Sequence, residues 1–124
     1  MTYNLFIDDE RCINDVRWAP WNIQQKYSMG VWQFARTMNE VIAMVQVYGM
    51  PNFISFDHDL GKNEPTGYDI AKWLVEVDMG RNKKILDRAA FHPDFDFYVH
   101  SKNPVGKANI EAYLNNYFKM KAEQ

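Results

Sequence analysis

The chain has 124 residues, of which 47% are hydrophobic and 24% charged, a composition typical of one globular domain and not of a disordered segment. Its net charge of −2 excludes a large nucleic-acid-binding surface, although a small local basic patch stays compatible with it. The single cysteine, Cys12, excludes an internal disulfide framework and a cysteine-rich zinc site, and it favours a cytoplasmic location. The sequence has no signal-peptide pattern and no run of roughly 18 apolar residues, so we expect no membrane segment.

Four short runs rich in β-branched and aromatic residues predict strands. They are residues 5–7, 31–36, 53–56 and 95–99. The first and third runs are almost wholly apolar, as expected of strands that are buried on both faces of a sheet.

Three segments have apolar residues at the i, i+3, i+4, i+7 spacing of an amphipathic helix. The first begins at Thr37, which stands at capping-box spacing from Glu40, and Gly49 ends it. The second spans residues 68 to about 77, and the third begins at Asn103. Residues 11–30 show no clean period and predict an irregular, aromatic-rich loop that could contain one helical turn. Residues 81–94 predict a loop around a helical turn.

Strands that alternate with helices indicate parallel pairing, because a helical crossover returns the chain to the same edge of the sheet. We therefore predict an α/β fold, an open parallel sheet of about four strands with flanking helices. Residues 1–124 form a single domain in this interpretation.

Three of the four predicted strands end in polar, chemically reactive residues. These are Asp8-Asp9-Glu10, Asp57-His58-Asp59 and His100-Ser101. In open parallel sheets, ligands bind outside the carboxyl ends of the strands, where the strand order reverses. The three clusters are therefore expected to converge on one edge of the sheet.

Acidic residues at strand ends often do no more than cap loops, but several of them held together repel one another strongly. A bound cation relieves that repulsion, and an oxygen-only ligand set favours Mg²⁺ or Mn²⁺. We predict Asp8, Asp9 and Asp57 as the metal ligands, with Asp59 and Glu10 nearby in roles that the sequence does not define.

His58 and His100 fall at the same predicted edge, and each is a candidate general acid or base, because histidine titrates near neutral pH. The alternative for either histidine is a structural hydrogen bond. The sequence does not decide which of the two acts.

The last predicted helix begins beside Ser101, and its free backbone N–H groups favour an anion. Ser101, Asn103 and Gly106 are therefore predicted to hold a phosphate, with Lys102 and Lys107 adding positive charge. An ordinary N-cap with solvated lysines is the competing interpretation. No Gly-x-Ser-x-Gly pattern surrounds Ser101, so we do not expect it to be a nucleophile.

The sequence resembles the response-regulator receiver family at three places. These are the acidic pair after the first strand, Asp57 with Leu60 three residues later, and Ser101 after a later strand. That resemblance implies that the acids bind Mg²⁺ and that Asp57 accepts a phosphoryl group. The family also carries a lysine after a fifth strand, and this sequence has no fifth strand to carry one.

The sequence more closely resembles the receiver-like family of cyclic-phosphate-processing receiver domains. Residues 6–11, 54–61 and 100–110 carry its three motifs, and the likeness extends over nearly the whole chain. The resemblance implies a receiver-like fold and an activity on the cyclic phosphate of a nucleotide or of an RNA end, as in RNA repair. It also implies a bacterial or phage setting.

The leading hypothesis is a metal-dependent phosphoesterase that opens a cyclic phosphate, with Asp57 as a metal ligand or as a covalent nucleophile. One alternative is a non-catalytic pseudo-receiver that acts through protein contacts, and another is a phosphoacceptor receiver at Asp57. The pattern Asp57-x-Asp59 also occurs in haloacid-dehalogenase-type phosphatases, but there it follows the first strand and here it follows the third.

Overall fold

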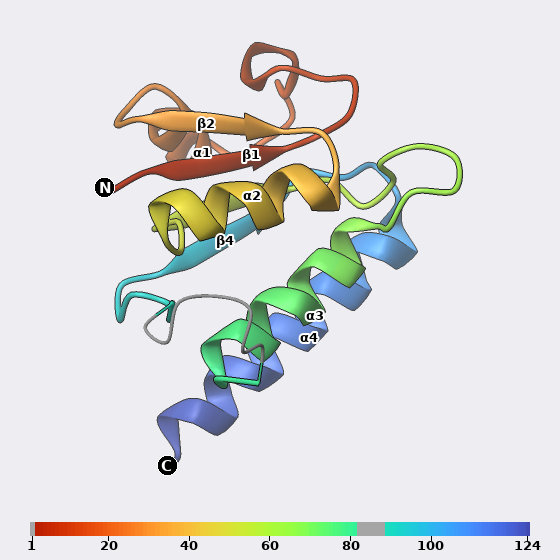
Figure 1. The fold of residues 1–124 in the computed structure, drawn as a ribbon. Coiled ribbons are helices and arrows are strands. Elements are labelled where there is room, and N and C mark those ends of the chain that lie inside the picture. Colours follow the sequence, from red (N-terminus) through yellow and green to blue (C-terminus); the bar gives the residue numbers. More distant parts are fainter. Residues whose placement is uncertain (1, 82–88) are drawn as a thin grey trace.

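The structure is a computed structural model, and it describes residues 2–81 and 89–124. Its centre is a four-stranded parallel sheet with the strand order β2-β1-β3-β4 (Figure 1). The strands are β1 (Asn4–Ile7), β2 (Trp32–Ala35), β3 (Phe53–Phe56) and β4 (Asp96–Val99). All four predicted strands are confirmed, and within residues 2–81 and 89–124 no fifth strand follows them.

The three predicted helices are also present. They are α2 (Met38–Tyr48), α3 (Gly67–Asp78) and α4 (Pro104–Ala122). Each begins at a side chain that accepts a backbone N–H from its first turn: Thr37 in α2, Thr66 in α3 and Asn103 in α4. Within the described residues, no helix is both long and apolar enough to cross a membrane.

Residues 11–30 are more ordered than the predicted irregular loop. They contain a 3-10 turn (Ile13–Asp15) and a seven-residue helix, α1 (Trp21–Tyr27). The sequence pattern missed α1 because the helix buries only Ile23 and Tyr27 and has no side-chain cap at Pro20. The helical turn expected within residues 81–94 falls largely on residues outside the described part of the chain.

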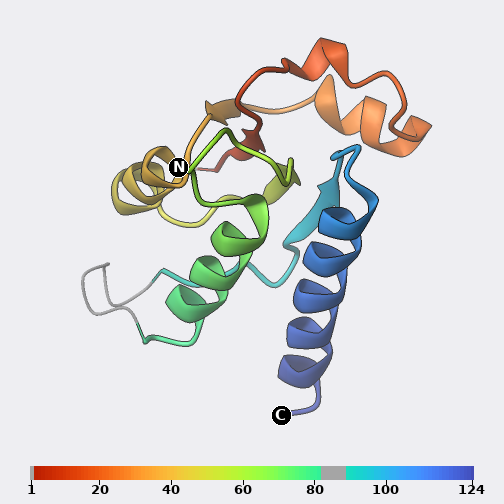
Figure 2. The ribbon, with the colours of Figure 1, turned by 90° about the vertical axis from the view of Figure 1, so that its right-hand side faces the viewer.

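The sheet is buried on both faces, as the apolar strands predict. On one face, Phe6 and Phe53 pack with Ile23 and Tyr27 of α1. The other face packs against α2 and α3, and α4 lies alongside α3 next to β4 (Figure 2). The core on this second face includes Leu5, Ile7, Ile54, Phe56, Val41, Ile70, Leu74 and Ile110.

The strand order creates one reversal point. From β1 the chain goes to β2 on one side, and it then returns to β3 on the other side of β1. The carboxyl ends of β1 and β3 are therefore neighbours from which the chain departs in opposite directions, which is where open α/β sheets bind ligands.

Candidate functional site

Three residues from distant parts of the chain follow directly after paired positions of the sheet. Ile7, Phe56 and Val99 are aligned across β1, β3 and β4, and the next residues are Asp8, Asp57 and His100. Backbone hydrogen bonds continue this register by one step: the Asp57 N–H donates to the Ile7 carbonyl, and the His100 N–H donates to the Phe56 carbonyl. The sheet therefore presents these three side chains as one row at its carboxyl edge.

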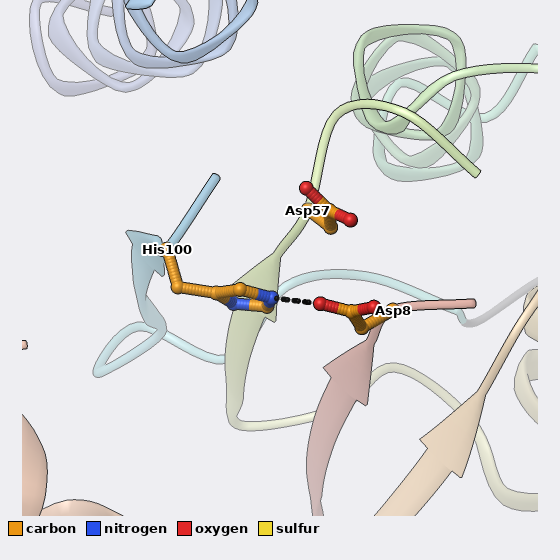
Figure 3. A group of neighbouring side chains, drawn as sticks. All are labelled: Asp8, Asp57 and His100. Atoms are coloured by element: carbon orange, nitrogen blue, oxygen red, sulfur yellow. Dashed lines mark hydrogen bonds and ion pairs between the residues drawn. The ribbon is translucent and has the colours of Figure 1, made fainter. Parts of the chain in front are cut away.

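The row brings potential ligand atoms of Asp8, Asp57 and His100 within 4.8 Å of one another (Figure 3). All three residues are buried, with 5%, 6% and 0% of their surface exposed. Two buried carboxylates at this distance need a compensating positive charge, because water screens the repulsion between them only weakly.

Asp8 is held in place through both of its carboxylate oxygens. Its Oδ1 accepts the backbone N–H groups of Glu10 at 2.9 Å and Arg11 at 2.8 Å, and its Oδ2 accepts a hydrogen bond from Nε2 of His100 at 3.0 Å. Burial acts to raise the pKa of Asp8, but the hydrogen bonds from His100 and the backbone outweigh it, so the pKa lies below its usual value. Asp8 is therefore a fixed anion at neutral pH.

Asp57 has the opposite electrostatic character. Burial raises its pKa, and the negative charge of Asp8 raises it further. The hydrogen bond that its Oδ1 accepts from the His58 backbone N–H, at 2.8 Å, opposes this rise without cancelling it. Asp57 is thus the member of the pair that takes up a proton more readily.

Arg11 supplies the positive charge that faces both acids. Its Nη1 lies 3.5 Å from Oδ2 of Asp8 and 3.9 Å from Oδ2 of Asp57. The strand and helix patterns of the sequence assign this residue no role, although Arg11 directly follows the acids whose charge needs neutralising.

His100 lies behind the site, not on its surface. Its ring stacks on Phe6 with 4.6 Å between ring centroids, and its Nδ1 hydrogen-bonds with Oγ of Ser55 at 2.7 Å. Ser55 in turn hydrogen-bonds with the hydroxyl of Tyr27 at 2.7 Å. Because an ionised carboxylate can only accept, Nε2 of His100 carries a proton and donates it to Asp8. The buried chain of hydrogen bonds fixes the orientation of that carboxylate.

A cavity of about 320 Å³ opens above the row of acids. Most of the residues predicted for the site line it. They are Asp8, Asp9, Glu10, Asp57, Asp59, Ser101 and Asn103, joined by Arg11, Gly61 and Lys102. His58, His100 and Gly106 are not among the lining residues.

His58 turns away from the cavity toward α4. Its Nδ1 lies 2.9 Å from Oδ1 of Asp59, and its ring covers Gly106 so closely that a Cβ there would lie 2.3 Å from its Cγ. Gly106 therefore makes room for the His58 ring, a packing role that sequence reasoning did not consider for it.

The start of α4 joins this arrangement through Asn103. Its Oδ1 accepts the Gly106 N–H at 3.0 Å, and its Nδ2 donates to Oδ2 of Asp59 at 3.2 Å. The Ser101 hydroxyl oxygen accepts the Asn103 backbone N–H at 3.1 Å. Hydrogen bonds from His58 and then from Asn103 hold the pKa of Asp59 below its usual value.

The start of α3 presses directly against Asp57. The Gly67 N–H donates to the His58 carbonyl at 2.8 Å, and a Cβ on Gly67 would lie 1.9 Å from the Asp57 carbonyl oxygen. Only glycine fits at this position, so Gly67 helps to build the site, a role that its sequence context does not predict.

The donors in the cavity suit a hard divalent cation. Asp8 and Asp57 contribute carboxylate oxygens from adjacent strands, and Asp9 lines the same cavity. Hard cations such as Mg²⁺ prefer this chemistry. His100 is the poorer ligand, because its Nε2 proton is engaged with Asp8.

Comparison with known protein families identifies a related family. A family model described as "Cyclic-phosphate processing Receiver domain" matches residues 3–116. No curated protein matches the chain. A solved structure, a CheY-like response regulator receiver domain protein from Methanospirillum hungatei JF-1, is 16% identical with a TM-score of 0.47, over 100% of this chain and 99% of that one. The match to the family model extends over most of the chain, and this protein belongs to the family of cyclic-phosphate-processing receiver domains.

Proposed function

We propose that this protein is a metal-dependent phosphoesterase that opens a cyclic phosphate on a nucleotide or on an RNA end. The description of the family supports the choice of a cyclic phosphate as the proposed substrate. The observation that carries the proposal is the pair Asp8 and Asp57, two buried carboxylates whose oxygens lie close together and line one polar cavity. Clustered, buried carboxylates in a polar cavity are typical of sites that bind a hard divalent cation.

The proposed metal ligands are Asp8, Asp9 and Asp57, with Mg²⁺ or Mn²⁺ as the cation. When bound, the cation polarises the phosphoryl oxygens and lowers the pKa of a bound water. Asp8 contributes a permanent charge in a fixed orientation, because three hydrogen bonds hold it.

Ring opening requires a nucleophile at phosphorus and a proton for the leaving oxygen. Water attacks the phosphorus and loses a proton, one of the two ring P–O bonds breaks, and the leaving oxygen gains a proton. The products are a phosphate monoester and a free hydroxyl group. Asp57, which lines the cavity beside Asp8, is the proposed acceptor of the water proton, and the leaving oxygen takes its proton from solvent. In the covalent variant the Asp57 carboxylate attacks phosphorus instead, and water then hydrolyses the acyl phosphate to the same products.

The remaining lining residues suit a phosphate ester. Ser101 and Asn103 place a hydroxyl and an amide in the cavity wall. The cavity, at about 320 Å³, has room for the cyclic phosphate and its sugar. His100 acts in this proposal by orienting Asp8, and His58 by holding Asp59 and the start of α4.

The test is turnover of a panel of cyclic phosphates by the purified protein, with Mg²⁺, with Mn²⁺ and with a chelator. The panel contains 2′,3′-cyclic nucleotides, an RNA oligonucleotide with a 2′,3′-cyclic end, ADP-ribose cyclic phosphate and 3′,5′-cyclic nucleotides. We expect metal-dependent opening of at least one member and a loss of about 100-fold or more in Asp57→Asn. The matched control is Asp94→Asn, because Asp94 is exposed and lies outside the cavity.

Three results would contradict the proposal. Full activity of a folded Asp57→Asn protein would remove Asp57 from the chemistry. No turnover of any cyclic phosphate, together with phosphorylation of the Asp57 side chain by acetyl phosphate and Mg²⁺, would instead establish a phosphoacceptor receiver. No turnover and no phosphorylation would favour the pseudo-receiver that acts through protein contacts.

A further inference from the structure

The acidic floor of the cavity is matched by a basic rim. Arg11 and Lys102 both line the cavity, and both rest on the ring of Trp18. The guanidinium carbon of Arg11 lies 5.2 Å from the ring centroid, and Nζ of Lys102 lies 4.2 Å from it. We call these three residues the basic clamp.

Trp18 is itself fixed to the site. Its Nε1–H donates to the His100 backbone carbonyl at 3.0 Å, although 39% of the residue is exposed. The indole therefore connects the segment before α1 to the end of β4, two parts of the chain 82 residues apart. A tryptophan that serves only to fill the core would be buried, and this one is not.

The basic clamp offsets the repulsion between an anionic substrate and the acidic residues of the cavity. A cyclic phosphate is an anion, and it must enter a cavity that Asp8, Asp9 and Asp57 line. Long basic side chains on a surface normally sweep through many rotamers, and ordering them costs free energy on binding. Cation–π contacts with one fixed indole hold both cations at the rim before the anion arrives.

We propose that Arg11 and Lys102, held in place by Trp18, form the subsite that binds the nonbridging phosphate oxygens. The ligand of this subsite is a phosphate group. The inference rests on the proposed function only for which phosphate ester carries that group. Arg11 presents a planar fork that matches two phosphate oxygens, and Lys102 contributes a point charge. Trp18 is a positioning residue.

The experiment is an NMR titration of the ¹⁵N-labelled protein with inorganic phosphate, at constant ionic strength maintained with chloride. The chain has four tryptophans, and the indole N–H signal of Trp18 is identified by its absence from Trp18→Phe. We expect that signal to shift with phosphate and not with chloride. Arg11→Gln and Lys102→Gln should each raise the Kd for phosphate about fivefold or more.

Lys26→Gln is the matched control. Lys26 also rests on an aromatic ring, that of Phe53 at 4.8 Å, and it is exposed and does not line the cavity. Its substitution removes the same charge and should leave the Kd for phosphate within about twofold. Trp18→Leu should weaken binding although no charge is lost, and Trp18→Phe, which keeps an aromatic face, should restore most of it.

The clamp and the proposed activity fail in different ways. If a cyclic phosphate is turned over and its KM is unchanged in folded Arg11→Gln and Lys102→Gln, the clamp is overturned and the activity stands. If nothing is turned over but phosphate binding depends on Arg11 and Lys102, the clamp stands and the activity fails. An equal effect of Lys26→Gln would reduce the clamp to a general charge effect and overturn it.

Discussion

Asp8 and Asp57 occupy equivalent positions in adjacent strands, yet their carboxylates differ in proton affinity. Asp8 accepts two backbone N–H groups and the His100 Nε2–H, whereas Asp57 accepts one backbone N–H and faces the charge of Asp8. At Asp8, hydrogen bonds to the charged form lower the pKa by more than burial raises it. At Asp57, burial has the larger effect and the pKa is raised. One carboxylate therefore stays ionised and the other is the more readily protonated.

The first prediction concerns His100, which joins Asp8 to Ser55. His100→Ala would remove one hydrogen-bond partner from each of two buried side chains, Asp8 and Ser55, and would open a cavity beside Phe6. We expect the free energy of unfolding to fall by about 2–5 kcal/mol, measured by urea denaturation. His92→Ala, at an exposed position, should change it by less than about 0.5 kcal/mol. A His100→Ala protein as stable as the wild type would show that the buried chain contributes nothing to the fold.

At the scale of the elements, helix N-termini close the site. The first residue of α3, Gly67, lies against the Asp57 carbonyl, and Gly106 in the first turn of α4 lies under the His58 ring. In both places the helix approaches the loop after β3 more closely than any side chain allows. The two glycines thus set how the helices dock on the carboxyl edge of the sheet.

The second prediction tests this docking at Gly106. Gly106→Ala raises helix propensity, but the new Cβ would lie 2.3 Å from Cγ of His58, so the ring must move. We expect a net destabilisation of about 1–3 kcal/mol in thermal and urea denaturation. In the double variant with His58→Ala, Gly106→Ala should cost much less, because the obstructing ring is gone. Additive effects in that cycle would contradict the packing role of Gly106.

At the scale of the whole molecule, Asp78 connects several segments at the end of the domain remote from the site. Its carboxylate accepts hydrogen bonds from the Phe91 N–H at 2.8 Å, from Lys121 at 2.8 Å and from the Tyr117 hydroxyl. It therefore connects α3, α4 and the segment that leads into β4. Burial acts to raise its pKa, but these hydrogen bonds outweigh it and the pKa is lowered.

The third prediction follows from that lowered pKa. A carboxylate with a lower pKa in the folded state stabilises the fold above its unfolded pKa of about 4, and this contribution is lost as the pH falls through the folded value. Asp78→Asn should therefore be less stable than the wild type at pH 7. The difference should shrink in denaturation curves recorded below about pH 4. A difference that does not depend on pH would show that the ionised carboxylate is not its source.

Local patterns in the sequence were sufficient to predict the four strands, the three longer helices and the caps at Thr37 and Asn103. They also placed Asp8, Asp57 and His100 at one edge, because each follows a strand directly and the strands are parallel. Helix α1 was missed because its seven residues contain too few apolar positions to show a period. The family follows from three short motifs, which are themselves local.

Only the tertiary structure decided which of these residues face the cavity. His58 sits between two acids in the sequence, yet its ring covers Gly106, 48 residues later in the chain. The contacts of Arg11 with Asp57 and of Trp18 with His100 also join distant segments. A one-dimensional pattern states that a residue ends a strand, but the direction of its side chain depends on strand register and on the helices that pack against it. Those contacts exist only once the chain has folded.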